Sequence, residues 1–196
     1  MTRLKEIGSI LVFVLLISQG SGQKFSFGSC PTVTSMADLT LDQISTTWRE
    51  YARTPSAYTH TWQCTLYTIT TVNSMVQYSL SITGQNKVTG QTFTVLGQIV
   101  PGGSTGAMTT TATFLTFTVP NWYTTWTANY YIIAGVNGAY LVLYSCQNVP
   151  FGKVESAIIL TTATATSAQI QAALTALSNV GYPLHGLRRG YQGCID

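Results

Sequence analysis

The sequence predicts an all-β protein: an eight-stranded antiparallel up-and-down barrel with one C-terminal α-helix packed outside it. Three features of the 196-residue chain support this prediction. From Arg49 to Ser145 the sequence shows a period of two more often than helical spacing, and eight segments between Trp48 and Thr162 are predicted as strands. Short turn sequences join these segments, and helical spacing of apolar residues begins only after the last of them. Eight antiparallel strands in this order can close into a barrel, which removes the edges of an open sheet.

The expected strands follow one another with short connections. Alternation is clearest from Val76 to Ile82, where every second residue is apolar. The Asn137-Gly138 pair suits a primed turn between the sixth and seventh strands. For the fifth strand, which is rich in Thr, the alternation does not assign an inward face. The eight predicted strands are 48–53, 63–71, 75–83, 92–100, 108–119, 129–134, 139–146 and 154–162.

The period changes from two to that of a helix in residues 166–179. This segment opens with a Thr/Ser cap candidate and ends close to Gly181 and Pro183. Its apolar residues form one stripe, which we expect to pack against the outside of the barrel. The stripe consists of Ile170, Ala173, Leu174 and Leu177.

The first 22 residues have the parts of a secretion signal in the usual order. Arg3 and Lys5 form a charged start, residues 7–17 are apolar but too short to span a bilayer, and residues 20–22 are small. The alternative is a buried core helix. We predict a signal peptide at 1–22, a single domain at 23–196 and a secreted, extracellular protein.

The charge of the chain excludes one class of partner. Only 8% of the residues are Asp, Glu, Lys or Arg, against about 25% in typical proteins. The only basic cluster in 23–196 is the pair Arg188-Arg189, whereas phosphate binding needs several cations on one face. We therefore expect no nucleic-acid partner, and no further segment has the length of a transmembrane helix.

Catalytic and metal sites are not predicted. The chain has two histidines, His60 and His185, and neither lies in a nucleophile or zinc-ligand motif. We expect no enzyme activity and no metal. His60 is interpreted as an exposed loop histidine; the alternative is a ligand of haem or a contact to a tetrapyrrole propionate.

The four cysteines, Cys30, Cys64, Cys146 and Cys194, are expected to form two disulfides in an oxidising compartment. Their spacing alone allows three connectivities.

Several short motifs resemble one family in their order and spacing. They are Gly28-Ser29-Cys30-Pro31, Asp38-Leu39, Trp48-Arg49-Glu50-Tyr51, Arg53-Thr54-Pro55, Tyr140 to Cys146 and the terminal Tyr191-Gln192-Gly193-Cys194. In this arrangement the chain resembles the lipocalins, especially the apolipoprotein D and insect bilin-binding group. The resemblance extends over essentially all of 23–196 and implies the same barrel and external helix.

Three positions depart from the usual lipocalin pattern. Thr46 stands where Gly is usual, and Gly135-Val136-Asn137 where Thr-Asp-Tyr is usual. Thr162 replaces an Arg that usually lies across the floor tryptophan. Loss of that cation–π contact removes about 1 to 2 kcal/mol unless another group replaces it. The chain therefore resembles a divergent member of the family.

The resemblance implies the disulfides Cys30–Cys146 and Cys64–Cys194, with Trp48 at the barrel floor. It also implies an interior wall that binds a ligand; alternatively, the same side chains fill the barrel as its core. Glu50 either orients a polar group of the ligand or is a structural carboxylate satisfied by water. The implied ligand-binding residues are Glu50, Tyr67, Ile69, Tyr78, Phe93, Val95, Trp126, Tyr130, Ile132, Leu143 and Ile158.

Two functions follow as hypotheses. The first is a secreted lipocalin that carries a small hydrophobic molecule, such as a bilin, retinoid, carotenoid, sterol or fatty acid, and requires no cofactor. Its ligand is expected to enter between the loops at 54–62 and 101–106. An unidentified receptor is a further expected partner of such a carrier. The second is a structural or surface-active protein that self-associates as a homo-oligomer because its charge is low.

Overall fold

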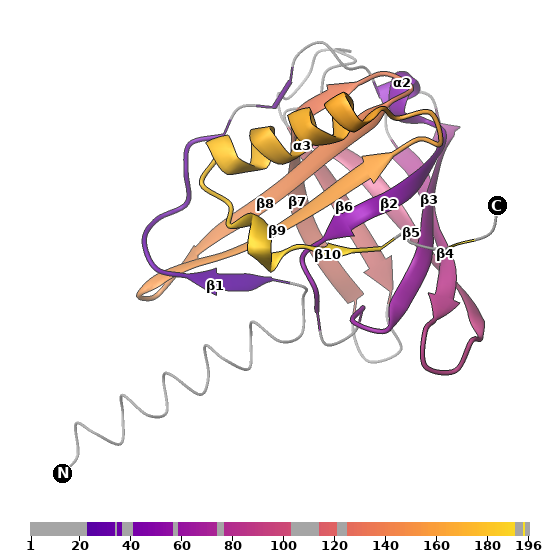
Figure 1. Ribbon diagram of the computed structural model, residues 1–196, viewed down its shortest axis with the longest axis horizontal. Coiled ribbons are helices and arrows are strands. Elements are labelled where there is room, and N and C mark those ends of the chain that lie inside the picture. The colour runs from indigo at the N-terminus through magenta and orange to yellow at the C-terminus, as the bar shows by residue number, and fades with distance from the viewer. Residues whose placement is uncertain are drawn as a thin grey trace.

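The computed structural model describes residues 23–33, 35–36, 41–56, 59–73, 77–102, 114–120, 125–190 and 194. Eight strands form a closed antiparallel barrel in chain order (Figure 1). Each strand pairs with the next, and the last pairs with the first through Glu50↔Leu160 and Arg53↔Ile158. The predicted fold class is therefore confirmed. The barrel strands are β2 (Thr47–Arg53), β3 (Trp62–Asn73), β4 (Gln77–Asn86), β5 (Thr92–Gly102), β6 (Phe114–Pro120), β7 (Thr125–Val136), β8 (Tyr140–Val149) and β9 (Gly152–Thr161).

The strand boundaries differ most from the expected ones in the middle of the chain. β7 begins at Thr125 rather than Asn129, because Trp126 and Ala128 continue to pair with β6. Of the fifth predicted strand, residues 108–113 lie outside the described part of the chain. The described remainder assigns its inward face, since Leu115 and Phe117 are buried in the core.

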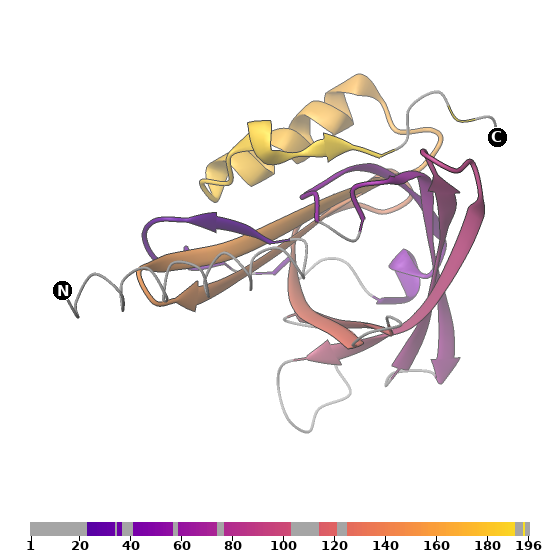
Figure 2. The ribbon, with the colours of Figure 1, turned by 90° about the horizontal axis from the view of Figure 1, so that it is seen from below.

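Two short strands lie beside the barrel in addition to the eight that were expected. β1 (Lys24–Ser26) pairs with β9, and β10 (Arg188–Arg189) pairs with β2. Figure 2 shows β1 and β10 against the ring of strands, with the β8–β9 hairpin extending past it. Strands of two or three residues are too short to show a period, so only their pairing reveals them.

The predicted C-terminal helix is confirmed as α3 (Ser167–Asn179). Thr166 is its N-cap, and Thr166 and Gln169 form a capping box in which each side chain bonds to the other's backbone N–H. Ala173 and Leu177 are fully buried against the outer face of the barrel. The helix therefore covers one side of the barrel (Figures 1 and 2).

The described residues also include two short helical segments, α2 (Leu41–Ile44) and the 3-10 turn η1 (Leu184–Gly186). Among the described helices, none combines the length and the apolar character needed to cross a membrane. The predicted signal peptide, residues 1–22, lies outside the described residues.

Alternation in the strands separates an inner and an outer apolar cluster. On β8, Leu141 and Leu143 face the inner cluster, whereas Val142 and Tyr144 face the outer one. The inner cluster receives side chains from all eight barrel strands. The outer cluster lies on β8 and β9 under α3. One strand pair thus contributes to two cores because its side chains point alternately to its two faces.

The connections of the barrel alternate between two ends, which corrects one expectation. Residues 54–61, 87–91 and 150–151 connect strands at what we call the loop end, along the lower side of Figure 1. Gly102 pairs with Phe114 at the opposite end, which we call the floor end. The loops at 54–62 and 101–106 therefore do not line one entrance, because successive antiparallel connections alternate; residues 103–106 themselves lie outside the described part.

Both disulfides implied by the lipocalin resemblance are present. Cys30 is bonded to Cys146 on β8, and Cys64 on β3 is bonded to Cys194. They join segments separated by 116 and 130 residues. Each end of the described chain is thereby fastened to the barrel wall.

Candidate functional site

The interior of the barrel brings together most residues of the predicted site. Glu50 lies inside the barrel and has 0% exposure. The side chain of Trp126 lies outside the described part of the structure. Phe93 and Val95 are half-buried and pack against the inner cluster. The predicted residues that are fully part of this cluster are Tyr67, Ile69, Tyr78, Tyr130, Ile132, Leu143 and Ile158.

The floor end is sealed around Trp48, which has no exposed surface. Its indole N–H donates to the carbonyl oxygen of Ile44 at the end of α2, at 2.9 Å. Thr162, which stands at the usual arginine position, instead donates its hydroxyl to the Gly138 carbonyl at 2.8 Å. A helix turn and a backbone carbonyl therefore anchor the tryptophan.

An irregularity in β2 places two charged residues inside the barrel. The pairing of β2 with β9 shifts between Glu50 and Ala52. Consequently Glu50 and Arg53 both lie opposite inward-facing residues of β9, whereas Ala52 lies opposite the outward-facing Ile159. In a regular strand, residues three apart would face opposite sides. Sequence reasoning placed Glu50 on the inner face but missed Arg53 for this reason.

Glu50 and Arg53 form a buried ion pair. An Nη1–H of Arg53 donates to Oε1 of Glu50, and the Tyr67 hydroxyl donates to Oε2 at 2.9 Å. Burial raises the pKa of Glu50 above its usual value, while the Arg53 charge and the Tyr67 hydrogen bond oppose that rise. The carboxylate is thus satisfied by protein groups, and the pair is close to neutral overall.

Arg53 also ties the pair to the loop end. Its guanidinium donates to the carbonyl oxygens of Thr59 and Trp62, and its Nε–H donates to Oγ1 of Thr59 at 3.2 Å. The guanidinium lies over the Trp62 ring, 5.7 Å from its centroid. Trp62 in turn contacts Phe93, with ring centroids 4.4 Å apart. An arginine and two aromatic rings therefore line the interior towards the loop end.

The C-terminal segment covers Glu50 from outside the barrel. The Gly190 N–H donates to the Tyr51 carbonyl, and the Cys64 N–H donates to the Gly190 carbonyl, both at 3.0 Å. A Cβ atom at Gly190 would lie 2.1 Å from Oε1 of Glu50, so only glycine fits. The Cys64–Cys194 disulfide holds this segment in place, which makes it part of the wall of the site.

Thr65 is the one described residue with a buried side-chain polar atom that has no hydrogen-bond partner. It is fully buried on β3, two residues before Tyr67, where the pairing of β3 with β4 shifts register between Gln63 and Leu66. An unsatisfied buried hydroxyl is uncommon, because its desolvation is not compensated. Thr65 is therefore a candidate for a hydrogen bond to a group other than the described side chains.

Two phenols supply further polar groups in the interior. Burial raises the pKa of Tyr67 and of Tyr130 well above their usual values, so both remain neutral donors. The Tyr130 hydroxyl lies 3.0 Å from Oγ of Ser156 on β9. The interior thus combines an apolar wall with a few fixed polar groups, the composition typical of small-molecule sites.

The two histidines are not assembled into a site. His60 lies exposed in the loop end, and its carbonyl oxygen accepts from Arg188. The exposed His185 lies 3.3 Å from Nζ of Lys24. Among the described residues, no three His, Cys, Asp or Glu side chains form a metal-binding group.

No protein-family model matches the sequence, and neither does any curated protein. Solved structures, however, share its fold. Apocrustacyanin C1 is 19% identical, with a TM-score of 0.71 over 87% of this chain and 92% of that chain. Insecticyanin from the tobacco hornworm Manduca sexta is 16% identical, with a TM-score of 0.70 over 86% and 88%. A biogenic amine-binding protein is 15% identical, with a TM-score of 0.59 over 82% and 86%. At such identities the similarity establishes the fold.

Proposed function

We propose that the protein is a secreted lipocalin that carries a small hydrophobic molecule inside the barrel. The observation that carries this proposal is the unpartnered Thr65 hydroxyl beside a largely apolar interior wall whose floor is sealed by Trp48. Apolar area would supply the affinity, and the hydroxyls of Thr65 and Tyr67 would orient the ligand. The remaining predicted wall residues would form the rest of the site.

The ligand would be an uncharged or weakly polar molecule with one hydroxyl or carbonyl group. Glu50 and Arg53 neutralise each other, so a charged group beside them would be buried without a counter-ion. Retinoids, sterols, carotenoids and protonated fatty acids meet this requirement. A bilin would need a further partner for its propionates.

Secretion and the absence of catalysis belong to the same proposal. Residues 1–22 would be removed as a signal peptide, leaving a single domain at 23–196. The two disulfides support an oxidising compartment, because such bonds are rare in the cytosol. The fold shared with a biogenic amine-binding protein supports ligand binding rather than a reaction.

Native mass spectrometry of the purified, secreted protein tests the proposal directly. We expect one apolar molecule per chain, and quenching of tryptophan emission when the emptied protein is titrated with retinol or a fatty acid. The absence of both would contradict a carrier. A concentration-dependent ladder in sedimentation, without any ligand response, would favour the self-associating protein instead.

A pair of matched variants tests the orientation of the ligand. Thr65→Val removes the buried hydroxyl and keeps the side-chain shape. The affinity for retinol should fall by about tenfold, because one hydrogen bond to the ligand is lost. Affinity for the corresponding hydrocarbon should not change. Thr70→Val, on the exposed face of the same strand, is the control and should leave both affinities unaltered.

A further inference from the structure

Three phenylalanines lie where β1 pairs with β9 beside the β8–β9 turn. We call Phe25, Phe27 and Phe151 the aromatic tip. Phe27 is 84% exposed and Phe151 is 74% exposed. The Phe25 ring packs edge-on against Phe27, with centroids 5.5 Å apart, and lies over Gly152, where a Cβ atom would approach it to 2.8 Å. Phe25 thus packs between Phe27 and Gly152, while the rings of Phe27 and Phe151 face solvent.

The aromatic tip is rigidly mounted. Ser26 pairs with Lys153 in the sheet, and the Cys30–Cys146 disulfide fastens the following segment to β8. Phe151 has a φ of 71°, in the left-handed region that bulky side chains rarely adopt. Phe151 is the second residue of the Pro150-Phe151 turn between Val149 and Gly152, where a positive φ completes the tight turn and leaves the ring facing solvent.

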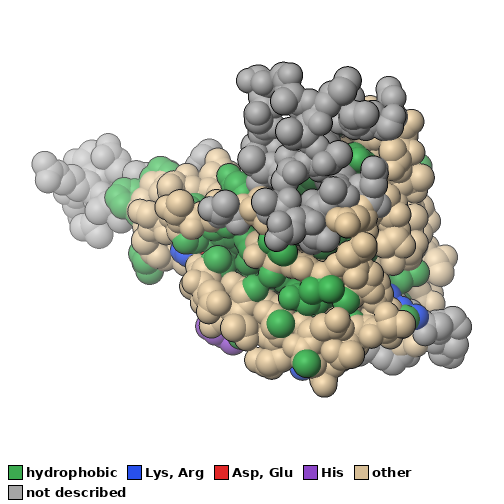
Figure 3. All heavy atoms as spheres, turned by 90° about the horizontal axis from the view of Figure 1, so that it is seen from above, with side chains coloured by type: hydrophobic (Ala, Val, Ile, Leu, Met, Phe, Trp, Pro, Cys, Tyr) green, Lys and Arg blue, Asp and Glu red, His purple; other side chains and the backbone are tan. Residues whose placement is uncertain are grey.

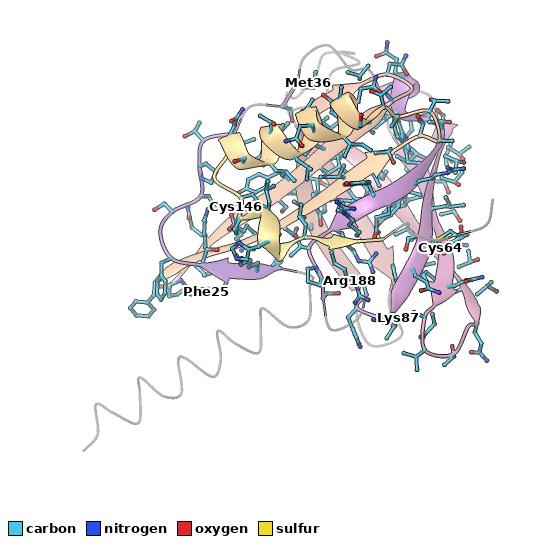
Figure 4. The ribbon with its side chains drawn as sticks, in the orientation of Figure 1. Phe25, Met36, Cys64, Lys87, Cys146 and Arg188 are labelled. Atoms are coloured by element: carbon cyan, nitrogen blue, oxygen red, sulfur yellow. A yellow bond between two sulfur atoms is a disulfide. The ribbon has the colours of Figure 1, made fainter. Side chains whose placement is uncertain are left out.

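Among the described side chains, the exposed charges are cationic. Both carboxylates with described side chains, Glu50 and Glu155, are buried and paired with cations. No Asp or Glu is visible among the described side chains on the floor-end face of Figure 3. At the loop end, by contrast, Figure 4 places Phe25, Arg188 and Lys87 along one lower edge of the molecule.

This edge combines aromatic and cationic groups on several loops. Lys87 is exposed beside Val88, which is 74% exposed, in the β4–β5 turn. Lys24 lies on β1, next to Phe25 of the aromatic tip. Aromatic rings favour the boundary between lipid headgroups and acyl chains, and nearby lysines attract anionic headgroups. A protein partner would need a contiguous patch of about 800 Å² rather than separate projections.

We propose that the loop end of the barrel docks on an anionic lipid surface. Phe27 and Phe151 enter the headgroup region, while Lys24, Lys87 and Arg188 contact the anionic headgroups. This docking rests on the exposed edge alone and does not depend on the proposed cargo. Docking in this orientation would, however, place the loop end of the barrel, and with it that end of the interior, next to the membrane.

Flotation with lipid vesicles tests the docking. The chain from Gln23, which contains every described residue, avoids unspecific binding by the apolar segment at 7–17. We expect partitioning onto vesicles of phosphatidylcholine with phosphatidylserine to exceed that onto phosphatidylcholine alone by about tenfold, and to weaken at high salt. Equal or absent binding to the two vesicles would overturn the proposal.

Variants then locate the contact. Phe27→Ser with Phe151→Gly removes both rings, and glycine accepts the left-handed φ, so the fold is retained. Partitioning should fall by about tenfold. Lys87→Glu should weaken binding only to the anionic vesicles. Thermal unfolding of each variant confirms that the loss does not come from misfolding.

The control is Val72→Ser with Leu96→Ser, which removes two other exposed apolar side chains, 63% and 64% exposed, away from the loop end. It should bind vesicles as the unmodified protein does. Unchanged binding by the tip variant would overturn the proposal. If that variant instead dissociated a dimer in sedimentation, the tip would contact a second copy rather than lipid.

Discussion

The barrel buries two glutamates, one on each side of its wall. Inside, Glu50 receives an Arg53 guanidinium and the Tyr67 hydroxyl. Outside, Glu155 receives Lys153 at 2.8 Å, the Tyr144 hydroxyl at 3.0 Å and the Ser26 hydroxyl at 2.8 Å. Each carboxylate is thus paired with a cation from its own strand and a tyrosine from a neighbouring one, as buried charges require.

The surroundings of the two pairs differ. β1 covers the outer pair and contributes Ser26, so that pair joins the N-terminal strand to the barrel. The inner pair has the unpartnered Thr65 on the neighbouring strand and phenols on the same wall. The same kind of ion pair therefore joins two strands on the outside and lies in a candidate binding site on the inside. The two places differ in whether the nearby buried polar groups all have hydrogen-bond partners.

Removing the cation from each pair should produce the largest difference. Arg53→Met leaves Glu50 buried with one hydrogen bond, and we expect it to lower the free energy of unfolding by about 3 to 5 kcal/mol. Lys153→Met leaves Glu155 with two hydroxyl donors, so a smaller loss of about 1 to 3 kcal/mol is expected. Urea unfolding followed by tryptophan emission measures both, and equal losses would show that the two pairs are equivalent.

Removing each disulfide should sharpen the comparison. Cys64→Ser with Cys194→Ser, and Cys30→Ser with Cys146→Ser, should each lower stability by about 2 to 5 kcal/mol. Only the first variant releases the segment that covers Glu50, so only it should also weaken ligand binding. Unfolding and ligand titration of the two variants separate these effects. Loss of ligand binding in both disulfide variants would mean that binding does not depend specifically on the C-terminal segment.

The pH dependence of stability should distinguish Glu50. Because its pKa is raised in the folded protein, the folded state holds this proton more tightly than the unfolded state does. Its contribution to stability is therefore present below the unfolded pKa of about 4.3 and is lost as the pH rises through the folded value. Glu50→Gln should abolish this fall, and Lys153→Met should keep it. Unfolding curves across the acidic range measure the difference; a fall that persists in the Gln variant would assign it to another group.

The smallest expected effects compare two buried threonines. Thr65→Val removes a hydroxyl that has no partner, so stability should stay the same or rise by about 1 kcal/mol. Thr54→Val removes a hydroxyl that accepts the Ala157 N–H at 2.7 Å and lies 2.7 Å from the Tyr182 hydroxyl. That variant should lose about 1 to 3 kcal/mol. Thermal unfolding measures both, and a large loss for Thr65→Val would point to an internal partner such as a bound water.

Periodicity along the chain is sufficient to predict the regular parts of the molecule. Alternation in β4 and the Thr166 cap of α3 depend on neighbouring residues alone, so the amino-acid order predicts them directly. The disulfide pairing came from the lipocalin resemblance, and spacing alone left three choices. The inward positions of Tyr67, Tyr130 and Leu143 followed from the same alternation and resemblance.

The sequence by itself determined the strand order, the external helix and most of the apolar wall, because these depend on a period that local residues impose. Tertiary structure alone decided that Arg53 faces inward, that Gly190 closes the wall over Glu50 and that Thr65 lacks a partner. A single shift in strand register reverses the face of every later side chain, and no local pattern reports it. Gly190 likewise contacts β2 and β3 only where these two strands lie apart. Their separation arises only when the barrel closes, so no local pattern predicts this contact.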